Sequence, residues 1–333
     1  MLLSRRLPRK LPSSLRQFSA SAILPNVHKV PCIGDILHSD SSTTDFKTRV
    51  SAFHKQLSDA RNAKSKASDL SSPGNAERAG IVKSILYGSR EGQKEEAEME
   101  QSYSKVMARG KYVHAIEIHH AKPDRVEDYV KLVGGVYPAI ATDKENNCHL
   151  VGSWKTEVGE CDTFGGALDT SRNRDTDSGE DAGYHNTFSR LAATPTFPKF
   201  QSSLAKIIRS RRTDLMQEFS FWPTSPPRSL GGIFELRTYT VLPGHLLEWE
   251  THWRRGLIAR KNVMEGVGAW FCQIGSLNTV HHLWQFADLR ERQVAREQSW
   301  GERGWSDTVH KTVPLIKKME SRILVPMSWS PLS

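Results

Sequence analysis

The stretch of residues 268–286, GAWFCQIGSLNTVHHLWQF, decides the fold because a short polar turn separates its two apolar runs. Residues 267–274 and 279–286 are typical of strands, and the Gly-Ser-Leu-Asn between them predicts a hairpin. The same stretch holds a thiol and two adjacent histidines. It therefore poses two questions: which fold contains the hairpin, and whether the histidines serve a site or fill a core.

The hairpin belongs to a pattern that occurs twice. Residues 113–132 and 233–253 each contain an alternating strand, a proline and a helix with an aromatic residue six positions after the proline, Tyr129 and Trp249. Continued through the hairpin, the second copy has the order strand, helix, strand, strand, helix, strand. We therefore predict an α+β fold of two tandem ferredoxin-like βαββαβ repeats, whose antiparallel sheets carry helices on one face.

The first copy departs from this pattern where its third strand should lie. Residues 164–181 read FGGALDTSRNRDTDSGED and have almost no apolar side chain after Leu168. We expect the third strand to be replaced here, which would leave unpaired backbone groups inside the sheet. Whether this segment is a genuine insertion or a gene-model artefact stays open.

Composition and charge define the remaining regions. Six cations precede the first acid, Asp35, so most of the net charge of +9 is N-terminal and a nucleic-acid partner is not expected. Residues 1–18 are rich in Arg and lack acids, which predicts a mitochondrial transit peptide and a matrix location. The predicted regions that follow are a polar linker with transient helices over 19–110, the first repeat over 111–222 and the second over 230–333.

No apolar run approaches the roughly 18 residues of a membrane span, and four cysteines without metal-ligand spacing predict no metal site.

Alternation along residues 233–241 predicts the two faces of a central strand. The more apolar face, which we expect to lie under the helices, carries Phe234, Leu236 and Thr238. The opposite face carries Glu235, Arg237 and Tyr239. The neighbouring strands carry bulky side chains on both faces, so this second face should also be buried. We therefore expect two sheets to pack face to face around a part-polar cavity, as a barrel between repeats or between subunits.

The cavity would take its polar groups from two strands. On residues 279–286, His282 shares a face with apolar residues and is interpreted as a core histidine, whereas His281 lies on the more polar face. His281 either faces a ligand or belongs to a structural hydrogen-bond network. The candidate ligand-cavity residues are His281, Arg237, Tyr239, Glu235 and Gln285. Catalytic residues stay unknown, because phosphate-binding, dinucleotide, zincin and hydrolase motifs are absent from the sequence.

Several segments resemble the NIPSNAP family: ELRTY at 235–239, PGHLLEW at 243–249, GAWFCQIGSLNTVHHLWQFADLRER at 268–292 and VPLIKKMESRI at 313–323. The resemblance implies a mitochondrial protein with the dimeric α+β barrel fold and with protein partners, either as a homodimer or with its repeats paired within one chain. Family members are discussed as trafficking and quality-control proteins, including mitophagy signals, and no catalytic residue carries over.

The resemblance leaves two functions open. The first is a non-enzymatic scaffold or adaptor in mitochondrial quality control or trafficking, without a cofactor. The second is a cofactor-free or haem-linked monooxygenase, or a small-ligand-binding protein, that uses the barrel cavity. A closed ion pair between Glu235 and Arg237 would favour the scaffold, and an unpaired Arg237 facing a void would favour ligand binding.

Overall fold

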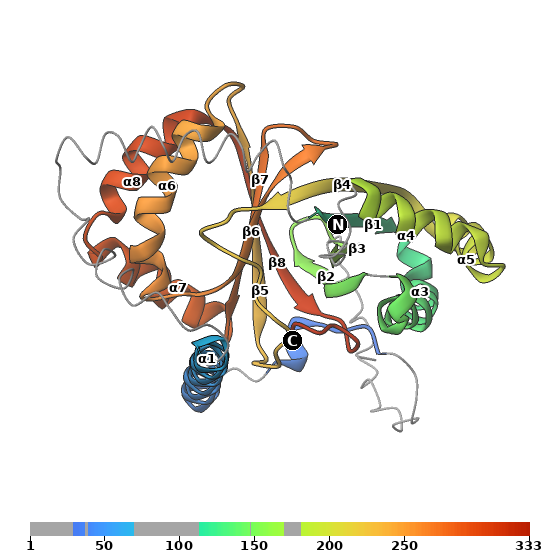
Figure 1. Cartoon of the computed structure of the whole chain (residues 1–333), viewed down its shortest axis with the longest axis horizontal. Coiled ribbons are helices and arrows are strands. Elements are labelled where there is room, and N and C mark those ends of the chain that lie inside the picture. The colour runs from blue at the N-terminus through green and yellow to red at the C-terminus, as the bar shows by residue number, and fades with distance from the viewer. Residues whose placement is uncertain (1–28, 37–38, 70–112, 147, 170–180) are drawn as a thin grey trace, which may run out of the picture.

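The computed structural model describes residues 29–36, 39–69, 113–146, 148–169 and 181–333, and every structural statement below concerns these residues. Their eight strands close into one barrel with the neighbour order β1-β3-β2-β8-β5-β7-β6-β4, and all neighbours are antiparallel (Figure 1). The strands are β1 (Val113–Ala121), β2 (His149–Val158), β3 (Thr163–Asp169), β4 (Ile208–Glu218), β5 (Ile233–Val241), β6 (Glu265–Ile274), β7 (Thr279–Phe286) and β8 (Ile316–Pro326). The α-helices are α1 (Asp40–Asp69), α3 (Val126–Thr142), α4 (Asp181–Ala193), α5 (Thr196–Ile207), α6 (Leu246–Lys261), α7 (Leu289–Gly301) and α8 (Trp305–Thr312). Short 3-10 helices cover Ile33–Asp35, Pro123–Arg125, Lys144–Asn146 and Val313–Leu315.

The two halves of the barrel have the same strand order. The first four strands lie as β4-β1-β3-β2 and the last four as β8-β5-β7-β6. In Figure 1, α3, α4 and α5 lie on one side of the strands, and α6, α7 and α8 lie on the other. The predicted α+β class of ferredoxin-like sheets with helices on one face is therefore confirmed. The halves join through β2 with β8 and through β4 with β6, so the barrel closes within one chain.

The third strand of the first half is present, so its expected replacement is wrong for residues 163–169. β3 pairs with β1 and β2 at once, with Ala167 opposite Ile116 and Gly165 opposite Trp154. Backbone hydrogen bonds to β1 and β2 stabilise β3 along both of its edges. Neighbouring strands supply most of the large apolar side chains of the core. A count of apolar residues therefore did not identify β3 as a strand. Residues 170–180 of the same segment lie outside the described residues.

Part of the region expected to be a polar linker is one long helix. α1 covers Asp40–Asp69, and its Phe46 is buried against Leu230 and Ala287 of the second half. Val50 and Phe53 also pack against this cluster. A helix that is polar apart from such a short apolar stripe has the composition of a linker, so composition alone could not distinguish a helix from a linker. The predicted transit peptide and residues 70–110 of the predicted linker lie outside the described residues. None of the helices that the structure describes has the length and apolar character needed to cross a membrane.

The two faces of β5 are opposite to the prediction. Phe234 and Leu236 point into the barrel, where the Phe234 ring meets the edge of Trp154 at a centroid distance of 5.7 Å. Tyr239 instead belongs to the cluster beneath the helices and contacts Trp249 of α6. Alternation defines two faces but does not say which one faces a helix, because a closed barrel buries both.

Candidate functional site

The interior of the barrel is filled by side chains, in place of the part-polar cavity that the sequence predicted. Trp154 and Met216 from the first half meet Trp270 and Leu283 from the second half in one apolar cluster. The space left among them is about 40 Å³. Cavities that bind small molecules usually measure roughly 300–1,000 Å³. Among the described residues, the space inside the barrel is therefore smaller than a typical small-molecule cavity.

The five candidate residues separate into three places. Glu235, Arg237 and Tyr239 lie beneath the helices of the second half, because they alternate with the residues that point inward. His281 points into the barrel, opposite Thr238 of β5. Gln285 lies near the other end of β7, where its side-chain amide donates to the carbonyl oxygens of residues 231 and 333 at 3.0 and 3.3 Å. The predicted single cavity site is therefore wrong.

Glu235 is the centre of a closed ion-pair network. Only 1 % of its side chain is exposed, and its Oε1 accepts hydrogen bonds from Arg237 at 3.1 Å, Arg292 at 2.7 Å and Ser321 at 2.6 Å. Burial alone would raise the pKa of this carboxyl, but the hydrogen bond from Arg292 and the charge of Arg237 outweigh it and lower the pKa to about 2. Arg237 also donates from Nε to the Tyr239 hydroxyl at 2.8 Å. Arg237 is thus paired with both Glu235 and Tyr239.

Two further arginines surround the same carboxylate. Arg296 of α7 lies 4.0 Å from Glu235 Oε1, and the guanidinium of Arg260 from α6 stacks on the Trp305 ring at 3.8 Å. Burial, together with the nearby charges of Arg296 and Arg237, lowers the pKa of Arg260 to about 9. Sequence reasoning missed Arg260, Arg292 and Arg296 because helix and strand residues far apart in the chain meet here only through tertiary packing. Three guanidinium groups thus lie within 4.0 Å of the Glu235 carboxylate, and Arg260 acts on the network only through its charge.

His282 is buried in the helix-side core, in agreement with its interpretation from the sequence. Its Nδ1 accepts a hydrogen bond from the Trp284 indole at 2.7 Å, so its partner is a side chain. Burial and the charges of Arg237 and Arg260 lower the pKa of His282 well below its ordinary value. The imidazole is therefore neutral at physiological pH and acts as a packing group.

His281 belongs to a separate polar cluster inside the barrel. Its Nδ1 lies 3.0 Å from the Thr238 hydroxyl, and burial lowers the pKa of the imidazole to about 3. Its neighbours on that side are Asp214 of β4 and Cys272 of β6. Sequence reasoning did not include Asp214, because only the pairing of β4 with β6 brings it near the hairpin.

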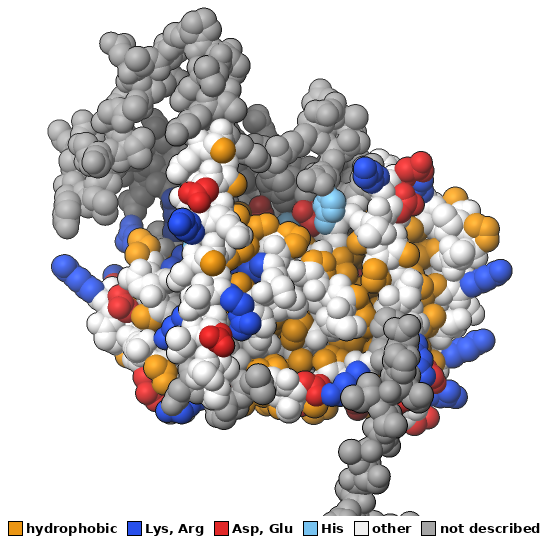
Figure 2. Space-filling view, turned by 90° about the horizontal axis from the view of Figure 1, so that it is seen from below, with side chains coloured by type: hydrophobic (Ala, Val, Ile, Leu, Met, Phe, Trp, Pro, Cys, Tyr) orange, Lys and Arg blue, Asp and Glu red, His pale blue; other side chains and the backbone are white. Residues whose placement is uncertain are grey.

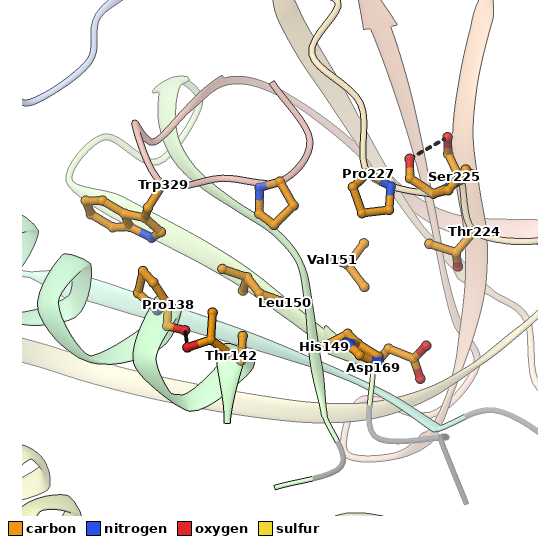
Figure 3. A pocket seen from close by; sticks show the side chains of 13 residues that line it. Pro138, Thr142, His149, Leu150, Val151, Asp169, Thr224, Ser225, Pro227 and Trp329 are labelled. Carbon is orange, nitrogen blue, oxygen red and sulfur yellow. Dashed lines mark hydrogen bonds between the residues drawn. The ribbon is translucent and has the colours of Figure 1, made fainter. Parts of the chain in front are cut away.

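The described residues also form an open groove of about 550 Å³ on the outside of the barrel (Figure 3). Pro138 of α3, Leu150 of β2, Pro227 and Trp329 give it apolar walls. The polar side chains of its lining include His149, Asp169 and Thr224, of which the first two lie opposite each other in the ladder of β2 and β3. No single stretch of sequence could predict this groove, because five separate segments line it.

The closed barrel of two ferredoxin-like halves defines this chain as an α+β-barrel protein. The profile of the NIPSNAP family matches residues 234–331. Protein NipSnap homolog 1 of Danio rerio is 40% identical over 220 residues, which cover 66% of this chain and 76% of that relative. Protein NipSnap homolog 2 of Homo sapiens is 38% identical over 223 residues, with coverage of 66% and 74%. The chain belongs to the NIPSNAP family. Among solved structures, an uncharacterized NIPSNAP domain protein from Burkholderia xenovorans is 28% identical and covers 29% of this chain and 96% of its own, with a TM-score of 0.28.

Proposed function

We propose that this chain is a non-enzymatic mitochondrial scaffold or adaptor, with a role in quality control or trafficking of the kind that the family resemblance implies. The observation that carries the proposal is the filled barrel interior, which leaves a space of only about 40 Å³ for a ligand. The closed pair between Glu235 and Arg237 is the arrangement that favours a scaffold over a ligand-binding site. The basic, acid-free residues 1–18 support import into mitochondria.

In this proposal the outer surface binds partners. The groove beside Trp329 is more than ten times as large as the space inside the barrel, and most of its lining is apolar. Figure 2 shows hydrophobic side chains gathered in the middle of one face, with many of the Lys and Arg side chains toward its edge. Apolar surface rimmed by polar groups is typical of protein contact sites.

A pair of matched variants tests whether the groove is used. Thr142 and Thr251 are both exposed helix residues whose hydroxyls donate to the carbonyl four positions earlier, but only Thr142 lines the groove. We expect Thr142→Arg to abolish the cross-links that the wild type forms through residues of the groove in intact mitochondria, and Thr251→Arg to keep them. Cross-links that survive Thr142→Arg unchanged would show that partners bind elsewhere.

Native mass spectrometry of the full protein isolated from mitochondria tests the non-enzymatic assignment. We expect a mature chain that begins near Ser19 and carries no organic ligand. A stoichiometric haem or another organic mass would contradict the proposal, since the barrel would then hold a cofactor or substrate. Recovery of the chain outside mitochondria would contradict the proposed location.

A further inference from the structure

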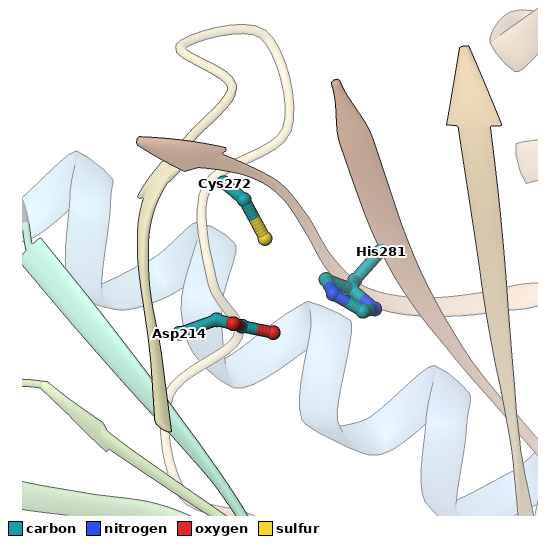
Figure 4. A group of neighbouring side chains, drawn as sticks. All are labelled: Asp214, Cys272 and His281. Carbon is teal, nitrogen blue, oxygen red and sulfur yellow. The ribbon is translucent and has the colours of Figure 1, made fainter. Parts of the chain in front are cut away.

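Three side chains with different donor atoms point toward one another at one end of the barrel (Figure 4). They are a carboxylate on β4, a thiol on β6 and an imidazole on β7, namely Asp214, Cys272 and His281. One donor atom from each lies within 4.8 Å of the others, and all three residues are buried. From this arrangement we propose that Asp214, Cys272 and His281 form a binding site for one divalent transition-metal ion, with zinc as the preferred ion. The inference is independent of the proposed scaffold function.

Strand pairing explains why these residues meet although they are far apart in the sequence. Cys272 lies opposite Met216 in the β4–β6 ladder, and His281 lies opposite Trp270 in the β6–β7 ladder. Asp214 is two positions from Met216 in β4, and Cys272 is two positions from Trp270 in β6. Met216 and Trp270 both point into the barrel. Because residues two apart in a strand share a face, Asp214 and Cys272 point inward as well. The backbone thus fixes three ligands on three adjacent strands, which is a more rigid support than a loop provides.

One of the donor atoms has no partner. His281 Nε2 makes no hydrogen bond within the described part of the chain, although the atom is fully buried. Buried polar atoms of this kind are rare and costly unless a further group satisfies them. A metal ion at the centre of the cluster would satisfy this atom.

The surroundings of His281 suit a metal ligand. When Nδ1–H donates to the Thr238 hydroxyl at 3.0 Å, the lone pair of Nε2 is free and the ring is held in one orientation. Metal-bound histidines commonly have such a second hydrogen bond. The nearby charges of Arg212 and Arg322 oppose a cation at this site, and the two anionic donors must outweigh them.

When the ion binds, it must displace Arg212 from Asp214 and the proton from the Cys272 thiol. Arg212 Nε lies 3.0 Å from Asp214 Oδ2, but about half of the Arg212 side chain is exposed, so it can turn toward solvent. The backbone N–H of Ser276 donates to the other oxygen, Oδ1, at 3.1 Å and can keep this bond. Burial raises the pKa of the Cys272 thiol to about 12, so the ion must displace the thiol proton, which passes to water as the metal–sulfur bond forms.

The donor set selects the class of ion. One carboxylate and one thiolate carry two negative charges, which a divalent cation neutralises inside an apolar barrel. Sulfur and imidazole donors disfavour magnesium and calcium and favour zinc, which takes four ligands and can hold water in the fourth position. An ion also needs far less space than an organic ligand, so the site is compatible with a filled barrel.

Cobalt and zinc binding to the full-length protein tests the site. After removal of metals with a chelator, we expect one equivalent of cobalt to give a thiolate-to-cobalt charge-transfer band, which zinc then abolishes. Cys272→Ala should lose the band. Cys148→Ala is the matched control, because Cys148 is also a buried free cysteine but is not a member of the cluster, and it should keep the band.

A second measurement covers the case in which Cys272→Ala does not fold. X-ray absorption at the zinc edge of the wild type should show one sulfur ligand among nitrogen and oxygen ligands. His281→Asn should lower zinc affinity at least tenfold and keep the folded circular-dichroism spectrum. Absence of a cobalt band, a band of equal strength in Cys272→Ala, or a zinc ion with only nitrogen and oxygen ligands would each overturn the proposal.

Discussion

The network around Glu235 makes a strong prediction about stability. Glu235→Gln keeps the shape of the side chain but removes the one negative charge among Arg237, Arg292 and Arg296. Lowering a pKa from 4.5 to about 2 corresponds to about 3 kcal/mol of stabilisation, and breaking a buried ion pair costs roughly 3–5 kcal/mol. We therefore expect the free energy of unfolding to fall by about 3 kcal/mol, measured by urea denaturation at pH 7 and followed by tryptophan fluorescence.

The pH dependence of the same variant gives an independent check. The folded pKa of Glu235 lies below its unfolded value of 4.5, so its stabilisation is present above pH 4.5 and is lost as the pH falls toward 2. The difference between wild type and Glu235→Gln should shrink over this interval. Glu320→Gln is the control, because this half-buried carboxylate on β8 pairs with Lys318 and should contribute less than about 1 kcal/mol. A loss below about 1 kcal/mol in Glu235→Gln, or a loss that does not change with pH, would refute the reasoning.

Three further predictions concern packing. Trp154→Ala removes the largest ring that the first half places inside the barrel and should cost about 3–5 kcal/mol in urea unfolding. Trp300→Ala on the exposed surface of α7 should cost no more than about 0.5 kcal/mol, and similar losses in both variants would argue against a filled interior. Asp288→Ala removes the N-cap of α7, whose carboxylate accepts from the Glu291 N–H at 2.8 Å, and should cost about 1 kcal/mol, with hydrogen exchange increased mainly in the first turn of α7. Phe46→Ala should increase hydrogen exchange throughout α1 and leave the strands protected, whereas unchanged exchange in α1 would show that the helix has another anchor.

The sequence predicted those features that a local pattern determines. Alternation and the two proline-to-helix steps gave the order of elements, and His282 was placed in the core because its neighbours in the strand are apolar. The orientation of β5 could not be predicted in this way. All eight residues of β7 are buried, so neither face of that strand identifies the interior. In a closed barrel both faces are covered, one by the opposite strands and one by helices.

The polar groups were harder to predict than the fold. Glu235 was a candidate from the sequence, but three of the arginines around it lie on two helices whose packing the sequence does not reveal. Asp214 was not considered at all, because its role depends on the register of β4 against β6. Strand β3 was missed for a related reason, since its glycines are compatible with a strand only where neighbouring strands supply the bulk.

The register of the barrel relates its two halves position by position. Residues 120 apart, such as Ile116 and Leu236, occupy equivalent places in β1 and β5. Asp214 lies opposite Ile116 and Arg322 lies opposite Leu236, so these two residues are equivalent as well. Because all neighbouring strands are antiparallel, β1 and β5 run in the same direction, so a residue on one wall of the barrel is matched to a counterpart on the opposite wall.

The proposed metal site is found on only one of these two walls. His281 lies opposite Trp270, and its counterpart Gly165 lies opposite Trp154, while Cys272 corresponds to Thr156 two positions beyond Trp154. The counterparts of the three ligands are therefore Arg322, Thr156 and Gly165, which line the small space inside the barrel and offer no carboxylate, thiol or imidazole. A barrel built from two identical subunits would have the same residues on both walls. Because both halves lie in one chain, one wall can carry three ligands while the other carries small and cationic residues, so a single asymmetric site depends on the covalent connection between the halves.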